Sequence, residues 1–312
     1  MGEWSKKIGE VGEEIVYEFL SLIGWGDAQK GIEISCIHGL KHKEQQSPKK
    51  THGIDYFLSL HSQLVNRTLD HLVISVKYSE SPYPSSPVTK FKDHFGDLAK
   101  TIECFKKSQL RIESNLAVSS IDQSRDIGVL FWLTNKDSSD DDIISKIATS
   151  RRIEDYVYDI IYLVDNNRIS FIYDTIKHIK AEFTKSKVEF FYPNTGRNFN
   201  PSNRESSGDI LPVEYINSSI LPIKITNTDG TKSLVISTIE EFHKDRLKRL
   251  IGLAQELSLN LTKNTIILFP NYNDLNHQND VQATKNGFKD KSFTKTVTVN
   301  SFRKDFRGAK NA

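Results

Sequence analysis

Residues 8–25 read IGEVGEEIVYEFLSLIGW, and no other stretch of the chain says more about its fold. Apolar residues recur there every three or four positions, the spacing that places side chains on one face of an α-helix. They are Ile8, Val11, Ile15, Phe19, Leu22 and Ile23. Gly24 is a typical stop, because glycine adopts the left-handed conformation at a helix end without steric cost. The pattern predicts an amphipathic helix over residues 3–24.

Two apolar segments further along the chain predict strands. HGIDYFLSL (residues 52–60) and HLVISVKYS (71–79) are rich in β-branched and aromatic residues, which favour strands. We expect neighbouring strands over 54–60 and 72–78, joined by a short polar connection. The alternating segment 31–37 predicts another strand, and the polar, basic segment 38–52 predicts a loop. SESPYPSSP (79–87), with its three prolines, must also be a loop.

The rest of the chain predicts a mixed α and β architecture in two domains. Helices are expected over residues 91–107, 141–149 and 238–258, the last opened by a capping box formed by Ser237 and Glu240. Strands are expected over residues 127–134, 157–164, 169–173, 188–192, 221–226, 233–237 and 265–269, with a hairpin at Asp229-Gly230. The polar stretch 193–209 separates the two predicted domains, residues 1–192 and 205–312.

Composition excludes several classes of protein. The 312 residues are 37% hydrophobic and 26% charged, with a net charge of +2, which is the balance of a globular protein. The longest apolar run, Ile127 to Leu133, is far shorter than a membrane span, and the opening residues lack the apolar stretch of a secretory signal. We therefore expect a cytoplasmic protein without membrane contact. GxxxxGK[ST] and GxSxG motifs are absent, so nothing indicates NTP hydrolysis or a serine nucleophile.

Cysteines and histidines predict no metal site on spacing alone. Cys36 and Cys104 are the only cysteines, and they lie far apart without CxxC spacing. The histidines of the first 80 residues also lack the paired spacing of zinc ligands. They are His38, His42, His52, His61 and His71. Neither a disulfide framework nor a zinc site is therefore expected.

The helix and the two strands together resemble the PD-(D/E)xK, or restriction-endonuclease-like, nuclease superfamily. The helix is similar to the pattern GxxGExxAxxxLxxxG, onto which fall Gly9, Gly12, Glu13, Val16, Leu20 and Gly24. GID at residues 53–55 resembles the Gly-x-Asp step of that family, and SVK at 75–77 stands where (D/E)xK is expected. The resemblance covers residues 3–135. It implies an α/β fold with a central mixed β-sheet flanked by helices, followed by a smaller α+β C-terminal region.

The resemblance also implies a set of catalytic residues, namely Glu13, Asp55 and Lys77. Glu13, Asp55 and the carbonyl group of Val76 would hold Mg²⁺ or Mn²⁺, because these cations prefer oxygen ligands. The cation would stabilise charge at phosphorus and make hydroxide available near neutral pH. Lys77 would orient or deprotonate the attacking water, or neutralise the developing charge.

One departure from the family pattern leaves two interpretations open. Ser75 stands where the acidic residue of (D/E)xK is expected. Either Glu13 and Asp55 suffice to hold the metal, or the site is degenerate and binds DNA without cutting it. Taken singly, each residue also has a simpler explanation: Glu13 as part of a charged helix face with Glu14 as its neighbour, Asp55 as a turn residue, and Lys77 as surface charge. Their order and separation favour the catalytic interpretation.

Two basic segments are candidates for nucleic-acid contact. One is the loop before Asp55, with Lys41, Lys43, Lys49 and Lys50. The other is the tail from Thr284, where eight basic residues face two acidic ones and phenylalanines are interleaved. Cations contact phosphates and rings stack on bases, although a solvated tail would have the same composition. The contacts expected in this tail are Lys289, Lys291, Lys295, Arg303, Lys304 and Arg307.

The sequence therefore predicts a metal-dependent DNA endonuclease. The opening MGEWSKKIGEVGEEIV looks like that of nuclease subunits from GAPS-type two-gene anti-phage defence systems, which implies a second protein subunit or a homodimer as partner. The alternative is a catalytically degenerate DNA-binding or regulatory subunit of a defence complex. A protein-interaction scaffold is the third possibility, favoured if neither Mg²⁺ nor DNA binds.

Overall fold

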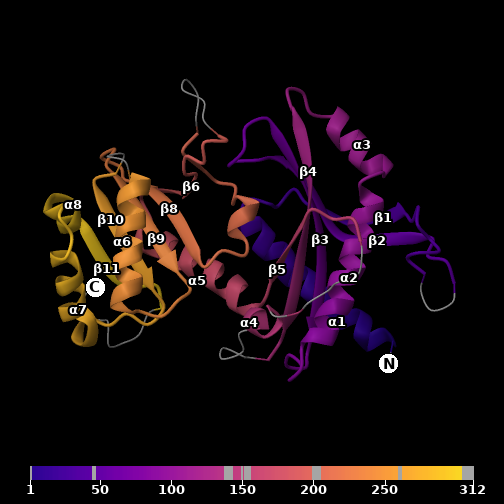
Figure 1. Cartoon of the computed structure of the whole chain (residues 1–312), viewed down its shortest axis with the longest axis horizontal. Coiled ribbons are helices and arrows are strands. Elements are labelled where there is room, and N and C mark those ends of the chain that lie inside the picture. The colour runs from indigo at the N-terminus through magenta and orange to yellow at the C-terminus, as the bar shows by residue number, and fades with distance from the viewer. Residues whose placement is uncertain are drawn as a thin grey trace. The chain divides into compact units, whose positions relative to one another are not determined.

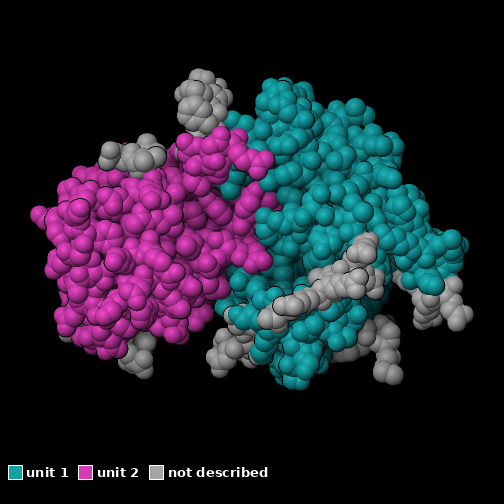
Figure 2. Space-filling view, in the orientation of Figure 1, with its two compact units in different colours: residues 1–169 teal, residues 170–312 magenta. Residues whose placement is uncertain are grey.

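The chain folds into two compact units, residues 1–169 and 170–312, each described here by itself (Figure 2). The computed structural model describes residues 2–43, 47–136, 143–148, 150, 156–198, 205–258 and 262–303. The predicted domain boundary at residue 192 lies inside the second unit. The reason is that strand β6 (Lys187–Phe191) pairs with a strand of the second sheet rather than the first.

The first unit is built on a five-stranded mixed sheet with the strand order β1-β2-β3-β4-β5 (Figure 1). The strands are β1 (Gln29–Ser35), β2 (Thr51–His61), β3 (Thr68–Ser79), β4 (Gln123–Thr134) and β5 (Ile160–Val164). β1, β2 and β3 are antiparallel neighbours, whereas β3, β4 and β5 run parallel. The expected strands over 54–60, 72–78 and 127–134 therefore form the centre of this sheet.

Two long helices cover opposite faces of the first sheet. They are α1 (Gly2–Leu22) and α2 (Val88–Phe105). Phe19 of α1 packs against Phe131 of β4, with ring centroids 6.0 Å apart. Leu130 and Trp132, the neighbours of Phe131, belong instead to the core beneath α2. Because successive side chains of a strand point to opposite faces, the two helices enclose the sheet between them.

The glycine pattern of α1 has a packing cause at Gly12. A Cβ atom added there would lie 2.3 Å from Cβ of Tyr78 on β3, so the helix approaches the strand more closely than any side chain allows. At Gly9, one turn earlier, nothing lies within 4 Å. After the helix ends at Leu22, Gly24 takes a positive φ of 81°, as its predicted role as a stop requires.

The second unit contains a six-stranded sheet with the order β11-β10-β9-β8-β6-β7. Its strands besides β6 are β7 (Ser207–Gly208), β8 (Ile220–Thr226), β9 (Lys232–Thr238), β10 (Asn264–Phe269) and β11 (Val297–Ser301). Its helices are α5 (Asn166–Glu182, which begins at the end of the first unit), α6 (Lys244–Ser258), α7 (Asp274–Asn286) and α8 (Lys291–Lys295). The expected hairpin forms, with Gly230 at a φ of 80° between β8 and β9.

The second unit repeats the topology of the first. In both, a helix precedes three antiparallel strands, a second helix follows, and two further strands add in parallel: α1-β1-β2-β3-α2-β4-β5 corresponds to α5-β6-β8-β9-α6-β10-β11. The helix preceding each sheet packs on the third strand of the repeat. Gly12 of α1 abuts Tyr78 of β3, and Thr175 of α5 lies within hydrogen-bond distance (2.9 Å) of Ser237 of β9.

Several predicted elements are corrected by the structure. Residues 169–173 are part of helix α5, not a strand. Helix α6 begins at Lys244, because Ser237 and Thr238 still belong to β9, so the predicted capping box is absent. The strand β11 was not expected from the sequence. The short helices α3 (Gln109–Leu116) and α4 (Ile143–Ile147) complete the first unit. In the part of the chain that the structure describes, no helix is both long and apolar enough to cross a membrane.

Candidate active site

The two strands that carry the predicted catalytic residues part from each other beside those residues. β2 and β3 pair from His61 and Leu69 up to Tyr56 and Ile74, and the register ends there. Asp55 and Ser75 are the first residues beyond this last pair. The backbone groups that follow are thus free of β2–β3 ladder bonds and available to side chains.

Asp55 occupies this opening between the strands. Its Oδ2 atom accepts a hydrogen bond of 2.6 Å from the backbone N–H of Val76, and the side chain of Ser75 bonds to it as well. The carboxyl group is half-buried. Burial raises its pKa, and the charge of Glu13 acts in the same direction, against the opposing effects of Val76, Lys77 and Ser75. Any further positive charge placed beside Asp55 would therefore stabilise the ionised form of its carboxyl group.

Lys77 lies on β3 near Asp55 and near a histidine of α2. Residues 73, 75 and 77 share one face of the strand, and Lys77 is opposite Trp132 of β4 on the α2 side of the sheet. His94 of α2 packs edge-on against Trp132, with ring centroids 5.6 Å apart. Burial, together with the charge of Lys77, lowers the pKa of His94 to about 4. His94 is thus a neutral imidazole at neutral pH.

Glu13 approaches the same region from helix α1. The hydroxyl of Tyr56, next to Asp55 on β2, donates a hydrogen bond of 2.9 Å to the backbone carbonyl oxygen of Glu13. The carboxylate of Glu13 lies 3.1 Å from Nζ of Lys30 on β1, and 28% of its side chain is exposed. Glu14 and Glu18 are exposed. The charge of Glu13 is among the main influences on the pKa of the Asp55 carboxyl.

The comparison with known families decides what this arrangement belongs to. Residues 1–168 match the family described as the GAPS4 protein PD-(D/E)XK nuclease domain. The chain belongs to this family. The matched residues coincide with the first compact unit, which has the restriction-endonuclease-like α/β fold that the family name implies. At the level of the family, the protein is a nuclease of anti-phage defence. No curated protein and no solved structure matches the chain.

In the structure of this GAPS4-family chain, the four lysines of the basic loop differ in their surroundings. Nζ of Lys41 lies 2.6 and 2.9 Å from the two carboxylate oxygens of Glu103 on α2, so Lys41 has a partner within the fold. Lys43 and Lys50 are exposed, and Lys49 is half-buried. The ammonium of Lys41 is thus engaged within the fold, and phosphate contact by the other three lysines stays a prediction.

Most of the predicted C-terminal tail is folded into the second unit. Phe288 and Phe293 are partly buried against its core, and Phe302 is 5% exposed beside Phe171, so these three rings have contacts within the fold. Phe306 lies outside the described residues. The cations at positions 289, 291, 295 and 303 are exposed on the folded unit. Lys304 and Arg307 lie outside the described residues.

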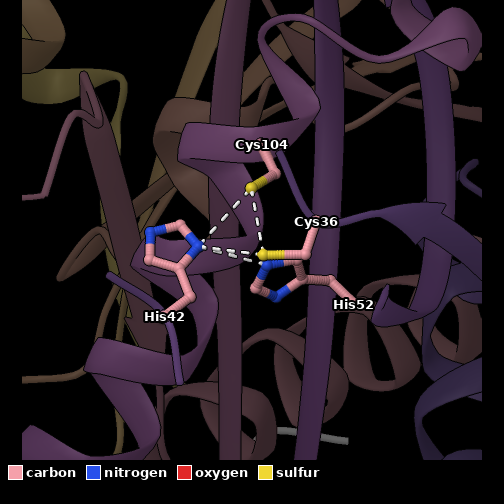
Figure 3. Close-up of side chains that lie close together, drawn as sticks. All are labelled: Cys36, His42, His52 and Cys104. Carbon is pink, nitrogen blue, oxygen red and sulfur yellow. Dashed lines mark hydrogen bonds between the residues drawn. The ribbon is translucent and has the colours of Figure 1, made fainter. Parts of the chain in front are cut away.

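The sequence also missed two features of the first unit. His94 lies within an expected helix, and no motif marks it. The second is a largely buried cluster of two cysteines and two histidines, called the Cys₂His₂ cluster below. It consists of Cys36, His42, His52 and Cys104, of which Cys36 is partly exposed (Figure 3). The expectation of no cysteine or histidine metal site rested on spacing along the chain. Spacing along the chain does not reveal the arrangement in space, where all four potential ligand atoms lie within 4.8 Å of one another.

Proposed function

We propose that the protein is a metal-dependent endonuclease that hydrolyses phosphodiester bonds of DNA, with the reaction confined to the first unit. One observation carries the proposal: the half-buried carboxyl of Asp55 stands where β2 and β3 part, with Lys77 and Glu13 acting on it. Strands β8 and β9 of the second unit contain no aspartate or glutamate. The strands of the second unit that correspond to β2 and β3 therefore lack a carboxylate equivalent to that of Asp55.

The residues around Asp55 fit a hard divalent cation, Mg²⁺ or Mn²⁺. The oxygen donors are the carboxylates of Asp55 and Glu13 and the backbone carbonyl of Val76, and Mg²⁺ prefers such ligands together with several waters. The N–H and C=O groups of one strand residue point to the same side, so the Val76 carbonyl shares the side on which its N–H meets Asp55. Such a cation supplies charge neutralisation at the phosphate and a more acidic bound water.

The remaining polar groups have roles that follow from their chemistry. The ammonium of Lys77 positions the attacking water and neutralises charge that develops on the phosphate. Ser75 bonds to Asp55 instead of supplying a second carboxylate. His94, neutral and behind Lys77, keeps that side of the site free of a second positive charge.

The second candidate is a DNA-binding subunit that does not cut, and Ser75 is the observation that favours it. A neutral hydroxyl is a weaker ligand than the carboxylate of the (D/E)xK pattern. Membership of a defence family supports a nucleic acid as the target, and we extend the proposal to a partner, either a second protein subunit or a second copy of this chain. In both candidates DNA meets the first unit on the side where β2 and β3 part.

The test is cleavage of linear and circular DNA by the full chain, with Mg²⁺, with Mn²⁺ and with EDTA. Asp55→Ala and Lys77→Ala should each slow cleavage by at least about a hundredfold, the typical cost of removing one charge-stabilising group. Glu13→Ala should raise the Mg²⁺ concentration needed for cleavage, and Glu14→Ala should not. Lys224→Ala, which removes the lysine of β8 in the second unit, is the matched control.

Three results would contradict the proposal. Normal cleavage by Lys77→Ala would remove the lysine from the reaction. An inactive Glu14→Ala variant together with a normally active Glu13→Ala variant would show that Glu14, not Glu13, supplies the carboxylate of α1. Tight binding of DNA without cleavage under any metal would select the non-cutting candidate.

A further inference from the structure

The Cys₂His₂ cluster lies away from the groups proposed for catalysis, beneath α2. Cys36 follows the last residue of β1, His42 lies in the connecting loop, His52 is on β2, and Cys104 is near the end of α2 (Figure 3). Both histidines are 1% exposed and Cys104 is 0% exposed. Cys36 is partly buried. Four separate segments of the chain thus bring soft and borderline metal ligands to one largely buried point.

The distances between the ligand atoms are those of a tetrahedral zinc site. Zn–S bonds of about 2.3 Å and Zn–N bonds of about 2.0–2.1 Å imply edges of about 3.8 Å for S–S, 3.5 Å for S–N and 3.3 Å for N–N. The two sulfur atoms are 3.9 Å apart. Nδ1 of His42 lies 3.5 Å from each sulfur and 3.3 Å from Nε2 of His52. These four edges fit a cation that contacts all four atoms.

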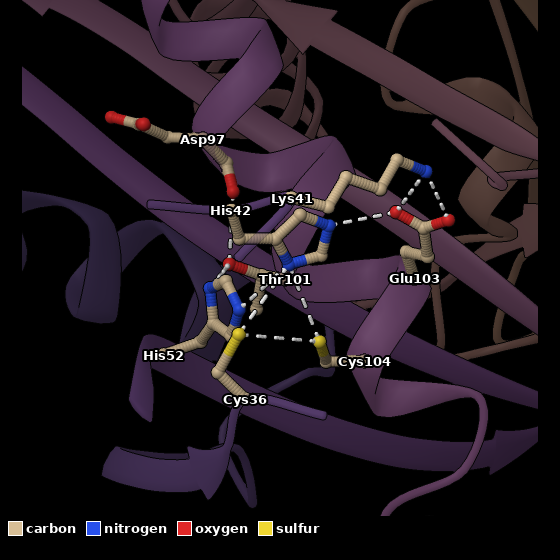
Figure 4. A network of polar contacts seen from close by, with 8 residues as sticks. All are labelled: Cys36, Lys41, His42, His52, Asp97, Thr101, Glu103 and Cys104. Carbon is tan, nitrogen blue, oxygen red and sulfur yellow. Dashed lines mark hydrogen bonds and ion pairs between the residues drawn. The ribbon is translucent and has the colours of Figure 1, made fainter. Parts of the chain in front are cut away.

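The outer nitrogens of both imidazoles already have partners, which turns their other nitrogens towards the centre. Nε2 of His42 lies 2.8 Å from a carboxylate oxygen of Glu103, which can only accept a hydrogen bond when ionised (Figure 4). Nδ1 of His52 lies 3.4 Å from the hydroxyl of Thr101, and that hydroxyl donates to the carbonyl oxygen of Asp97. Each imidazole therefore donates outward and presents a lone pair inward.

Two inward lone pairs 3.3 Å apart repel each other unless a positive group lies between them. The S–H groups of Cys36 and Cys104 could donate to these lone pairs, but S–H groups are weak donors. They would therefore be poor substitutes for a positive group. Backbone N–H groups of Ile37 and His38 bond to the sulfur of Cys104, although burial, the larger effect, raises the pKa of this thiol. A disulfide does not fit, since its sulfurs would have to move from 3.9 Å to about 2.05 Å.

We propose that the Cys₂His₂ cluster binds one Zn²⁺ ion with a structural role. Four protein ligands leave no open coordination position, as in other structural zinc sites. The contact of His42 with Glu103 is the outer-shell carboxylate typical of zinc-bound histidine, and Lys41 neutralises the other side of that carboxylate. The ion joins Cys36 and His42 to α2 and to His52 of β2, three residues before Asp55. It is distinct in position and ligand type from the site proposed for Mg²⁺.

Zinc content of the full chain tests the proposal directly. Protein purified under reducing conditions from zinc-supplemented cells should carry one zinc per chain by elemental analysis. Cobalt reconstitution should give thiolate-to-cobalt charge-transfer bands with the intensity of tetrahedral coordination. Cys104→Ser and His52→Ala should lose most of the zinc, whereas His61→Ala, an exposed histidine on the same strand, should keep it. Glu103→Gln should keep the site but weaken zinc affinity by about 10–100-fold.

If the variants fold poorly, zinc removal and restoration in the wild-type chain still test the proposal. Removing zinc with a strong chelator should lower Tm, and Zn²⁺ but not Mg²⁺ should restore it. A wild-type chain without zinc that also fails to bind one equivalent of Zn²⁺ or Co²⁺ when reduced would overturn the proposal. So would a native disulfide between the two cysteines, or full zinc content in a variant lacking both. None of these readouts depends on DNA cleavage, so the zinc site and the nuclease proposal stand or fall separately.

Discussion

At the scale of single residues, Asp55 shows how a functional position opposes stability. Burial and the charge of Glu13 raise the pKa of this carboxyl, so the ionised form is less stable in the folded chain than in the unfolded one. Such a group contributes most to stability below its unfolded pKa, and that contribution is lost as the pH rises through the raised folded pKa. At neutral pH without metal, ionised Asp55 therefore destabilises the fold.

We expect Asp55→Asn to raise the unfolding free energy in EDTA at pH 7 by about 1 kcal/mol, a usual size for a single stabilising change. Asparagine keeps an oxygen that can accept from the N–H of Val76. The gain should shrink as the pH falls towards the ordinary carboxyl value, because Asp55 is then protonated in both states. Denaturant unfolding at several pH values measures this. Added Mg²⁺ should stabilise the wild type and not the variant. A loss of stability in EDTA at pH 7 would show that the charge of Asp55 is favourable.

The sequence could predict which residues meet at this site, but not their surroundings. The order of the helix, Asp55 and Lys77 indicated neighbouring strands, and those strands pair as expected. The effect of burial on Asp55 depends on distant segments that pack around it. His94 is beyond the reach of sequence reasoning for the same reason, since only the packing of α2 on the sheet places it near Lys77.

At the scale of helices and strands, Gly12 allows helix α1 to pack closely against strand β3. Tyr78 of β3, next to Lys77, packs where a side chain at position 12 would stand. A methyl group there must push the helix away from the strand that carries Lys77. The helix motif of the family thus has a physical reason that is independent of catalysis.

We expect Gly12→Ala to destabilise the protein by about 1–3 kcal/mol, the usual cost of overpacking a core. Gly9→Ala is the matched control, because nothing lies within 4 Å of its added methyl group. That variant should be neutral or up to about 1 kcal/mol more stable, since alanine favours the helix. Thermal or denaturant unfolding distinguishes the two. Equal effects at both positions would mean that helix propensity, not packing, determines stability at Gly12.

Two elements show where local patterns fail. Residues 169–173 are rich in β-branched and aromatic side chains, which favoured a strand. Their buried positions, however, continue as Phe171, Ile172, Thr175, Ile176 and Ile179, a helical spacing that extends past the predicted strand. Similarly, Ser237 precedes a real helix, but pairing with β8 and β10 keeps it in β9. In both cases, tertiary contacts beyond the local window decide the structure.

At the scale of the whole molecule, the chain contains one topology twice. The repetition was invisible as a sequence period, because the two units share strand order and direction rather than residues, and their connections differ in length. The Cys₂His₂ cluster could not be predicted from the sequence for a related reason: its members come from four segments between residues 36 and 104. At this scale the sequence predicts two basic segments as DNA contacts, and this stays a prediction.

Exposed lysines occur on both units, and salt dependence can separate their contributions to DNA binding. Each phosphate contact releases counterions, so the slope of log K against log salt is about −0.9 for each phosphate contacted on duplex DNA. One set is Lys43, Lys49 and Lys50 in the loop before Asp55, of which Lys49 is half-buried. The other is Lys289, Lys291 and Lys295, on and just before α8. Mutating either set to alanine should make the slope shallower by about one for each lysine that contacts a phosphate.

The expected result is a shallower slope and weaker binding for both triple variants of the full chain, measured by fluorescence anisotropy on duplex DNA at several salt concentrations. Lys180, Lys185 and Lys248, also exposed, form the control set with the same loss of charge. If the control changes the slope as much, the effect is one of net charge only. If only the loop set changes it, the basic residues of the second unit do not touch DNA and serve assembly or solubility. Because every variant in the comparison loses three charges, any difference between the slopes reports position rather than total charge.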